Sequence, residues 1–146
     1  MSGEDYHMHY TASKLQTDLA GKKILLVEDH KLNMEIAKKI LEKKQMKVTC
    51  AYNGAEAVAL FEKMPEYMFD AVIMDIRMPV MNGLEAAAAI RAGAKADAKT
   101  IPIIAMSANA FAEDMEKSRR AGMNRHVAKP VEPERLFGVL SEIFSD

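Results

Sequence analysis

The stretch Lys23-Ile-Leu-Leu-Val-Glu-Asp29 decides the fold. After Lys23 it is an unbroken run of leucine and β-branched residues, and it ends in two acids. A strand that is covered on both faces shows this pattern, because no polar residues alternate with the apolar ones. Four further segments of strand length follow, at Val48–Ala51, Ala71–Met74, Ile101–Met106 and Arg125–Val127.

Segments of helical period separate these strands. Leu32, Ile36 and Ile40 recur at four-residue steps in a lysine-rich stretch. Asn53 is a favourable N-cap, Gly122 suits the end of a helix, and Pro133 suits the start of one. Five strands that alternate with helices predict a parallel sheet covered on both faces with right-handed crossovers. The expected helices lie around Leu32–Ile40, at Gly54–Lys63, Leu84–Arg91 and Ala110–Ala121, and from Pro133 onward.

The bulk composition is that of one ordinary globular domain. The chain has 146 residues and a net charge of −1, from 20 basic and 21 acidic side chains. This balance does not favour nucleic acid or anionic lipid as a partner. No apolar stretch approaches the ~20 residues of a membrane span, and the single cysteine, Cys50, permits no internal disulfide. We expect a tail or linker over 1–20, the domain over 21–146, and a cytoplasmic location.

Polar residues stand where the strands end. Glu28 and Asp29 follow the first strand, Asp75 the third, Ser107 the fourth and Lys129 the fifth. The carboxyl ends of parallel strands meet at one edge of a sheet, where such folds place their sites. We therefore expect three carboxylates, one hydroxyl and one ammonium to lie close together.

This combination of groups indicates phosphoryl transfer. Crowded carboxylates repel one another, and a hard divalent cation such as Mg²⁺ or Mn²⁺ removes that repulsion. A carboxylate nucleophile can form an aspartyl phosphate, with hydroxyl and ammonium groups to stabilise the transferred charge. Asp75 ends the central strand before a proline-containing loop and is the candidate nucleophile, whereas Glu28 and Asp29 suit metal binding. Helix N-capping is the alternative role for Asp29.

At these positions the sequence resembles the response-regulator receiver family of two-component signalling. The resemblance covers about residues 22–144 and depends on four ordered motifs. The motifs are Ile24-Leu-Leu-Val-Glu-Asp29, Val72-Ile-Met-Asp-Ile-Arg-Met-Pro-Val-Met-Asn-Gly83, Ile103-Ile-Ala-Met-Ser-Ala108 and His126-Val-Ala-Lys-Pro130.

The resemblance implies a flavodoxin-like (βα)5 fold, a doubly wound parallel sheet with strand order 2-1-3-4-5. It implies that Asp75 is the phosphoacceptor and that Glu28 and Asp29 hold Mg²⁺. The backbone carbonyl of Arg77 would be a further metal ligand.

The resemblance also implies the parts that respond to phosphorylation. Ser107 matches the switch hydroxyl and Lys129 the lysine that pairs with the phosphate, with a cis bond between Lys129 and Pro130. The switch position three residues before the lysine holds His126, where the family more often has Tyr or Phe. A histidine can titrate near neutral pH. The surface expected to change is formed by the fourth helix, the fifth strand and the fifth helix.

The resemblance implies a histidine kinase or a histidine phosphotransfer protein as phosphodonor. The segments Glu28-Asp-His-Lys-Leu-Asn33 and Met106-Ser-Ala-Asn109 are similar to receivers of hybrid sensor kinases. We expect a signalling domain without enzymatic turnover, nucleic-acid binding or membrane contact, and a homodimer through the fourth and fifth helices is compatible with the family.

The alternative functions are a phosphatase, a flavin-binding flavodoxin and a pseudo-receiver. A phosphatase of the haloacid dehalogenase type needs a second aspartate two residues after the nucleophile, where this chain has Arg77. A flavodoxin needs a Ser/Thr/Gly loop after the first strand, where this chain has Glu28 and Asp29. A pseudo-receiver would bind partners without being phosphorylated.

Overall fold

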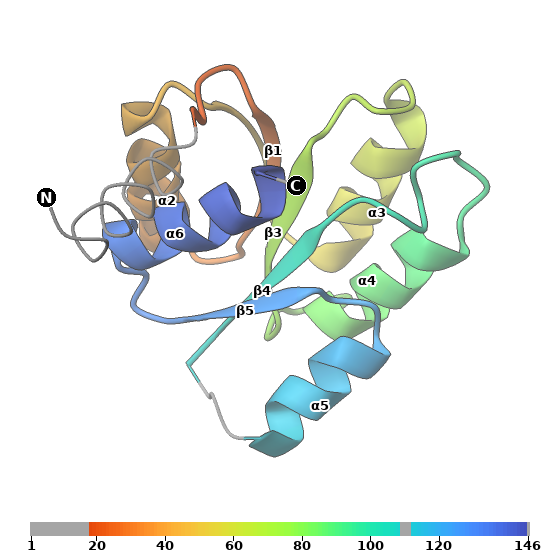
Figure 1. The fold of residues 1–146 in the computed structure, drawn as a ribbon. Coiled ribbons are helices and arrows are strands. Elements are labelled where there is room, and N and C mark those ends of the chain that lie inside the picture. The colour runs from red at the N-terminus through yellow and green to blue at the C-terminus, as the bar shows by residue number, and fades with distance from the viewer. Residues whose placement is uncertain (1–17, 109–111, 146) are drawn as a thin grey trace, which may run out of the picture.

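The structure is a computed structural model that describes residues 18–108 and 112–145 (Figure 1). Helix labels follow the figure and begin at α2. The strands are β1 (Lys23–Val27), β2 (Lys47–Ala51), β3 (Ala71–Asp75), β4 (Ile103–Ser107) and β5 (Arg125–Ala128). The helices are α2 (Lys31–Lys43), α3 (Gly54–Lys63), α4 (Gly83–Ala92), α5 (Ala112–Arg120) and α6 (Pro133–Phe144).

The sheet has the predicted topology. Its strand order is β2-β1-β3-β4-β5, and each neighbouring pair is parallel. In the register, Val27 lies opposite Met74, and Asp75 lies opposite Met106. The carboxyl ends of β1, β3 and β4 therefore meet at one edge. The predicted flavodoxin-like order 2-1-3-4-5 is confirmed.

Helices cover both faces of the sheet. Figure 1 shows α2 and α6 on one side, and α3 and α4 on the other, with α5 beside β5. Every residue of β3 is buried, as the unbroken apolar run predicted. One core cluster lies under α3 and α4, and a second lies under α2 and α6. The central strand is thus covered by packed side chains on both faces.

The residues that α2 buries are not those whose apolar repeat predicted the helix. Met34, Ala37 and Leu41 face the core, whereas Leu32 is 62% exposed and Ile36 is 48% exposed. Residues three and four positions apart share a helix face, so two apolar stripes run along α2. One stripe packs on the sheet. In the other, Leu32 and Ile36 remain at the surface, whereas Ile40 packs partly against the core.

Most predicted element boundaries agree with the structure to within one or two residues. β4 begins at Ile103, not at Ile101, because Pro102 has no N–H to donate, although its carbonyl accepts from the Val72 N–H at 2.9 Å. Asn53 caps α3 through a bond from the Glu56 N–H, and Gly122 follows α5 with a φ of 104°. The predicted start of the fourth helix, at 110–111, lies outside the described residues.

The predicted domain boundary at residue 21 stays a prediction. Leu19 is nevertheless buried, with 4% of its surface exposed, and belongs to the core under α2 and α6. Within the described part of the chain, none of the helices combines the length and the apolar character needed to cross a membrane.

Candidate functional site

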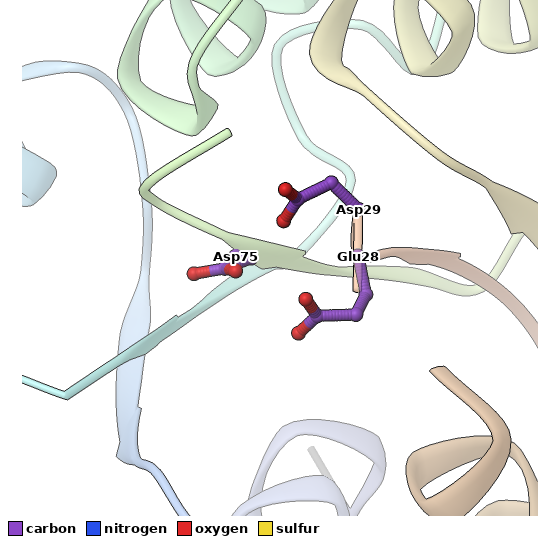
Figure 2. Close-up of side chains that lie close together, drawn as sticks. All are labelled: Glu28, Asp29 and Asp75. Carbon is purple, nitrogen blue, oxygen red and sulfur yellow. The ribbon is translucent and has the colours of Figure 1, made fainter. Parts of the chain in front are cut away.

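Three acids meet at the carboxyl edge of the sheet. Glu28 and Asp29 directly follow β1, and Asp75 is the last residue of the neighbouring strand β3. Figure 2 shows the three side chains extending from these strand ends. Each offers a carboxylate oxygen, and these oxygens lie within 4.8 Å of one another. Glu28 is 1% exposed and Asp75 is 5% exposed, whereas Asp29 is exposed to solvent.

Lys129 lies between the two buried acids. Its Nζ donates to Glu28 Oε2 at 2.8 Å and to Asp75 Oδ2 at 3.0 Å. Burial alone would lower the pKa of Lys129, but the bonds to Glu28 and Asp75 outweigh it and raise the pKa above its ordinary value. Burial raises the pKa of Glu28, and the bond from Lys129 opposes that rise. The Lys129–Pro130 bond is cis, which confirms that prediction.

The chemistry of this cluster fits a hard divalent cation. Its oxygen donors are the type that Mg²⁺ prefers, and the cluster contains no imidazole or thiol. In their ionised form, the three carboxylates exceed the charge of the single Lys129 ammonium by two units. A divalent cation would find oxygen ligands here, and its charge would balance this excess.

Backbone groups of the loop after β3 make hydrogen bonds that fix the position of Asp75. The Arg77 N–H donates to Asp75 Oδ1 at 3.3 Å, and the Ile76 N–H donates to the Met106 carbonyl at 3.1 Å. The Ile76 carbonyl in turn accepts from the Gly83 N–H at 2.8 Å. The Arg77 side chain is exposed, so its backbone is the part beside the acids.

Ser107 and His126 lie on neighbouring strands beyond the acids. Ser107, 4% exposed, ends β4 opposite Ala128, and His126 lies opposite Ala105. Successive strand residues face opposite sides of a sheet, so Ser107 and Ala105 share one face. Both predicted switch residues are thus placed on the two strands that adjoin α5.

His126 is half-buried beside a groove. Its Nε2 is buried and has no hydrogen-bond partner among the described residues. Burial lowers the pKa of His126 below its ordinary value of 6.5, and Asp114 partly opposes this effect. A groove of about 500 Å³ runs along α5 and the start of β5, lined by Met115, Glu116, Ser118, Arg119, Met123, Asn124, Arg125 and His126.

Sequence reasoning missed two features near the acids. It did not indicate that the apolar residues Leu32 and Ile36, which follow Asp29 closely in the chain, are exposed, or that Ile36 lines a small pocket with Glu28 and Lys129. It also assigned no role to Gly54, which lies against the loop after Asp75. The repetition of Asn-Gly at residues 53–54 and 82–83 was an available signal.

The comparison with protein families agrees with this geometry. The family model described as the response regulator receiver domain matches residues 24–141. The chain belongs to this family. The receiver domain is thereby a module of two-component signalling, as the motifs implied.

The receiver domain is similar to parts of two curated histidine kinases. It is 35% identical over 122 residues to "Hybrid signal transduction histidine kinase I" of Dictyostelium discoideum, covering 82% of this chain and 7% of that protein. It is 34% identical over 149 residues to "Histidine kinase 3" of Arabidopsis thaliana, covering 90% of this chain and 14% of that protein. The chain therefore spans a small part of these relatives.

Solved structures of receiver domains share the fold. The receiver domain of a sensor histidine kinase of Pseudomonas aeruginosa has a TM-score of 0.78 and 36% identity, covering 87% of this chain and 100% of that one. That structure is described as having a magnesium ion coordinated in its active site cleft. The chemotaxis protein CheY4 of Vibrio cholerae also has a TM-score of 0.78, with 29% identity over 86% of this chain and 100% of that one.

Proposed function

We propose that the receiver domain accepts a phosphoryl group on Asp75 from a phosphohistidine donor, in a reaction that requires Mg²⁺. The observation that carries this proposal is the setting of Asp75. It ends the central strand, touches Lys129 Nζ at 3.0 Å and has two further carboxylates within 4.8 Å. This is the set of groups that a carboxylate nucleophile needs for phosphoryl transfer.

A carboxylate oxygen of Asp75 attacks the phosphorus atom of the donor. The new bond is an acyl phosphate O–P bond, and the P–N bond to the donor imidazole breaks with its electron pair on nitrogen. Glu28, Asp29, Asp75 and the Arg77 carbonyl would hold Mg²⁺, or Mn²⁺ in its place, and the ion would supply positive charge to offset the carboxylates and the transferred group.

The Lys129 ammonium is the positive charge that the chain itself brings to the site of phosphoryl transfer. Its ammonium already lies at hydrogen-bond distance from the attacking carboxylate. As Asp75 acquires the phosphoryl group, Lys129 exchanges that carboxylate oxygen for a phosphoryl oxygen. Its bond to Glu28 Oε2 at 2.8 Å keeps the ammonium at the site during the exchange.

Phosphorylation then changes the surface formed by α5, β5 and α6. These are the fourth helix, the fifth strand and the fifth helix of the sequence prediction. Ser107 moves toward the phosphoryl group, and His126 moves with it. Such a switch is a local change of charge that biases a two-state element. One output of this change is a homodimer through α5 and α6. We further propose that the reaction takes place in the cytoplasm.

The phosphohistidine is part of a histidine kinase or a histidine phosphotransfer protein, so a protein surface must dock beside Asp75. We assign this contact to the exposed apolar stripe of α2. Leu32, which is 62% exposed, lies three residues after Asp29. Contiguous exposed apolar patches mark sites of protein–protein contact.

The test is incubation with acetyl phosphate and Mg²⁺, followed by measurement of intact mass. Wild type should gain one phosphoryl group, and the gain should disappear with EDTA and in Asp75→Asn. An equal gain in Asp75→Asn would assign the phosphoryl group to another residue. No gain in wild type under conditions where Mg²⁺ binds would favour a pseudo-receiver.

A further inference from the structure

The two helices nearest the loop after Asp75 begin in the same way. Each has an asparagine N-cap followed by a buried glycine, Asn53–Gly54 in α3 and Asn82–Gly83 in α4. Among the described glycines, only Gly21 and Gly122 have a positive φ. The left-handed backbone therefore does not explain Gly54 or Gly83. A helix would otherwise favour alanine over glycine at such positions.

Close backbone contact explains both glycines. A Cβ on Gly54 would overlap the Met81 carbonyl oxygen, and a Cβ on Gly83 would overlap the Asp75 carbonyl oxygen and the Ile76 Cα. All these neighbours are backbone atoms, which cannot rotate away as a side chain does. The two helices thus begin in direct contact with the segment that joins β3 to α4.

The missing Cβ atoms allow two hydrogen bonds onto this segment. The Gly54 N–H donates to the Met81 carbonyl at 3.0 Å, and the Gly83 N–H donates to the Ile76 carbonyl at 2.8 Å. The first N–H groups of a helix have no partner within the helix. Here, two of these donors fix the segment near its two ends.

The fixed segment has a strained backbone. Val80 has a φ of 68°, a left-handed conformation that a β-branched residue rarely adopts. The Met81 N–H donates to the Pro79 carbonyl at 2.7 Å, which tightens the same turn. Strain of this kind persists only where the surroundings hold it. The Gly54–Met81 bond is one contact from a separate element that does so.

We propose that Gly54 is a positioning residue for phosphoryl transfer. Its contact with Met81 fixes the segment that carries Arg77, and Arg77 donates to Asp75 Oδ1 at 3.3 Å. This inference rests on the proposed function, because the proposed function makes the segment that carries Arg77 part of the metal site. Gly54 acts through the loop backbone and touches neither the acids nor the transferred group.

The experiment is a Mg²⁺ titration of Gly54→Ala, monitored by calorimetry and by the NMR shift of the Arg77 amide. The added Cβ should displace the Met81 carbonyl and weaken Mg²⁺ binding by about 10-fold, the lower end of the effect of losing a hydrogen-bond partner of a metal ligand, because Gly54 acts on the ligands indirectly. A dissociation constant within about twofold of wild type in a folded Gly54→Ala would overturn the proposal.

Two matched variants separate positioning from helix stability. Gly138→Ala places the same substitution in α6, where an added Cβ meets nothing within 4 Å. Asn53→Ala removes the cap that accepts from the Glu56 N–H at 2.8 Å, but adds no atom against Met81. Both should bind Mg²⁺ like wild type. If Asn53→Ala weakens Mg²⁺ binding as much as Gly54→Ala does, the effect comes from fraying of the start of α3, and the positioning role of Gly54 is overturned.

Hydrogen exchange of the wild-type protein gives a test that does not depend on the folding of Gly54→Ala. Mg²⁺ should slow exchange of the Gly54 amide, which donates to the loop, and leave the Glu56 amide, which donates to its own cap, unchanged. A Gly54 amide that is insensitive to Mg²⁺ contradicts the inference. Neither measurement uses a phosphodonor, so failure of Asp75 to be phosphorylated is a separate result that overturns the proposed function.

Discussion

Replacing Lys129 with methionine removes the ammonium from between two buried carboxylates. Methionine keeps most of the side-chain length and leaves Glu28, 1% exposed, and Asp75, 5% exposed, without their shared cation. Removing one member of a buried ion pair typically costs about 3–5 kcal/mol. For a domain of this size, each kcal/mol lowers the Tm by about 2–4 °C. We therefore expect Lys129→Met to melt about 6–20 °C below wild type in EDTA.

Mg²⁺ should narrow this difference in stability. A ligand at 100 times its Kd stabilises the folded state by about 2.7 kcal/mol. The variant lacks a positive charge at the site and should bind Mg²⁺ more tightly than wild type. Thermal unfolding of both proteins in EDTA and across a Mg²⁺ series measures the effect. Equal Tm values in EDTA, or a difference that Mg²⁺ leaves unchanged, would refute the role given to Lys129.

The remaining predictions concern docking, pH and backbone strain. The double variant Leu32→Glu, Ile36→Glu should be phosphorylated by acetyl phosphate at the wild-type rate. Transfer from a phosphorylated kinase or phosphotransfer protein to this variant should be slower. Equal slowing of both reactions would reject the docking surface. Because burial lowers the pKa of His126 below 6.5, the unfolded chain binds this proton first, so wild type should lose stability as pH falls below about 6.5. His126→Phe should lose less stability between pH 7.5 and 5.5 in denaturant titrations, and parallel losses would contradict this. Val80→Asn should raise the free energy of unfolding by about 1 kcal/mol, because asparagine tolerates a left-handed backbone, and an unchanged value would show that the turn is unstrained.

The fold could be predicted because its determinants are local in the sequence. The unbroken apolar runs at β1 and β3 specify strands buried on both faces. Alternation with helices then limits the topology to a few forms. The strand-end acids followed from the same logic, since parallel strands bring Glu28, Asp29 and Asp75 to one edge.

Features that depend on packing between distant segments could not be predicted. The four-residue repeat of Leu32 and Ile36 indicated a helix, but did not reveal which of the two apolar stripes meets the sheet. The strand ends predicted that Lys129 lies near the acids, but not that its ammonium bonds Glu28, 101 positions away in the chain, together with Asp75. The role of Gly54 depends on a backbone oxygen at Met81, which no side-chain pattern reports.

The central claim is that Asp75 itself forms the acyl phosphate. The most direct measurement is borohydride reduction of protein treated with acetyl phosphate and Mg²⁺, because borohydride converts an aspartyl phosphate to homoserine. Peptide mapping by mass spectrometry should then find homoserine at position 75, in amounts that depend on Mg²⁺. Homoserine at position 29, or unmodified Asp75 in protein that carries the phosphoryl group, would contradict the account.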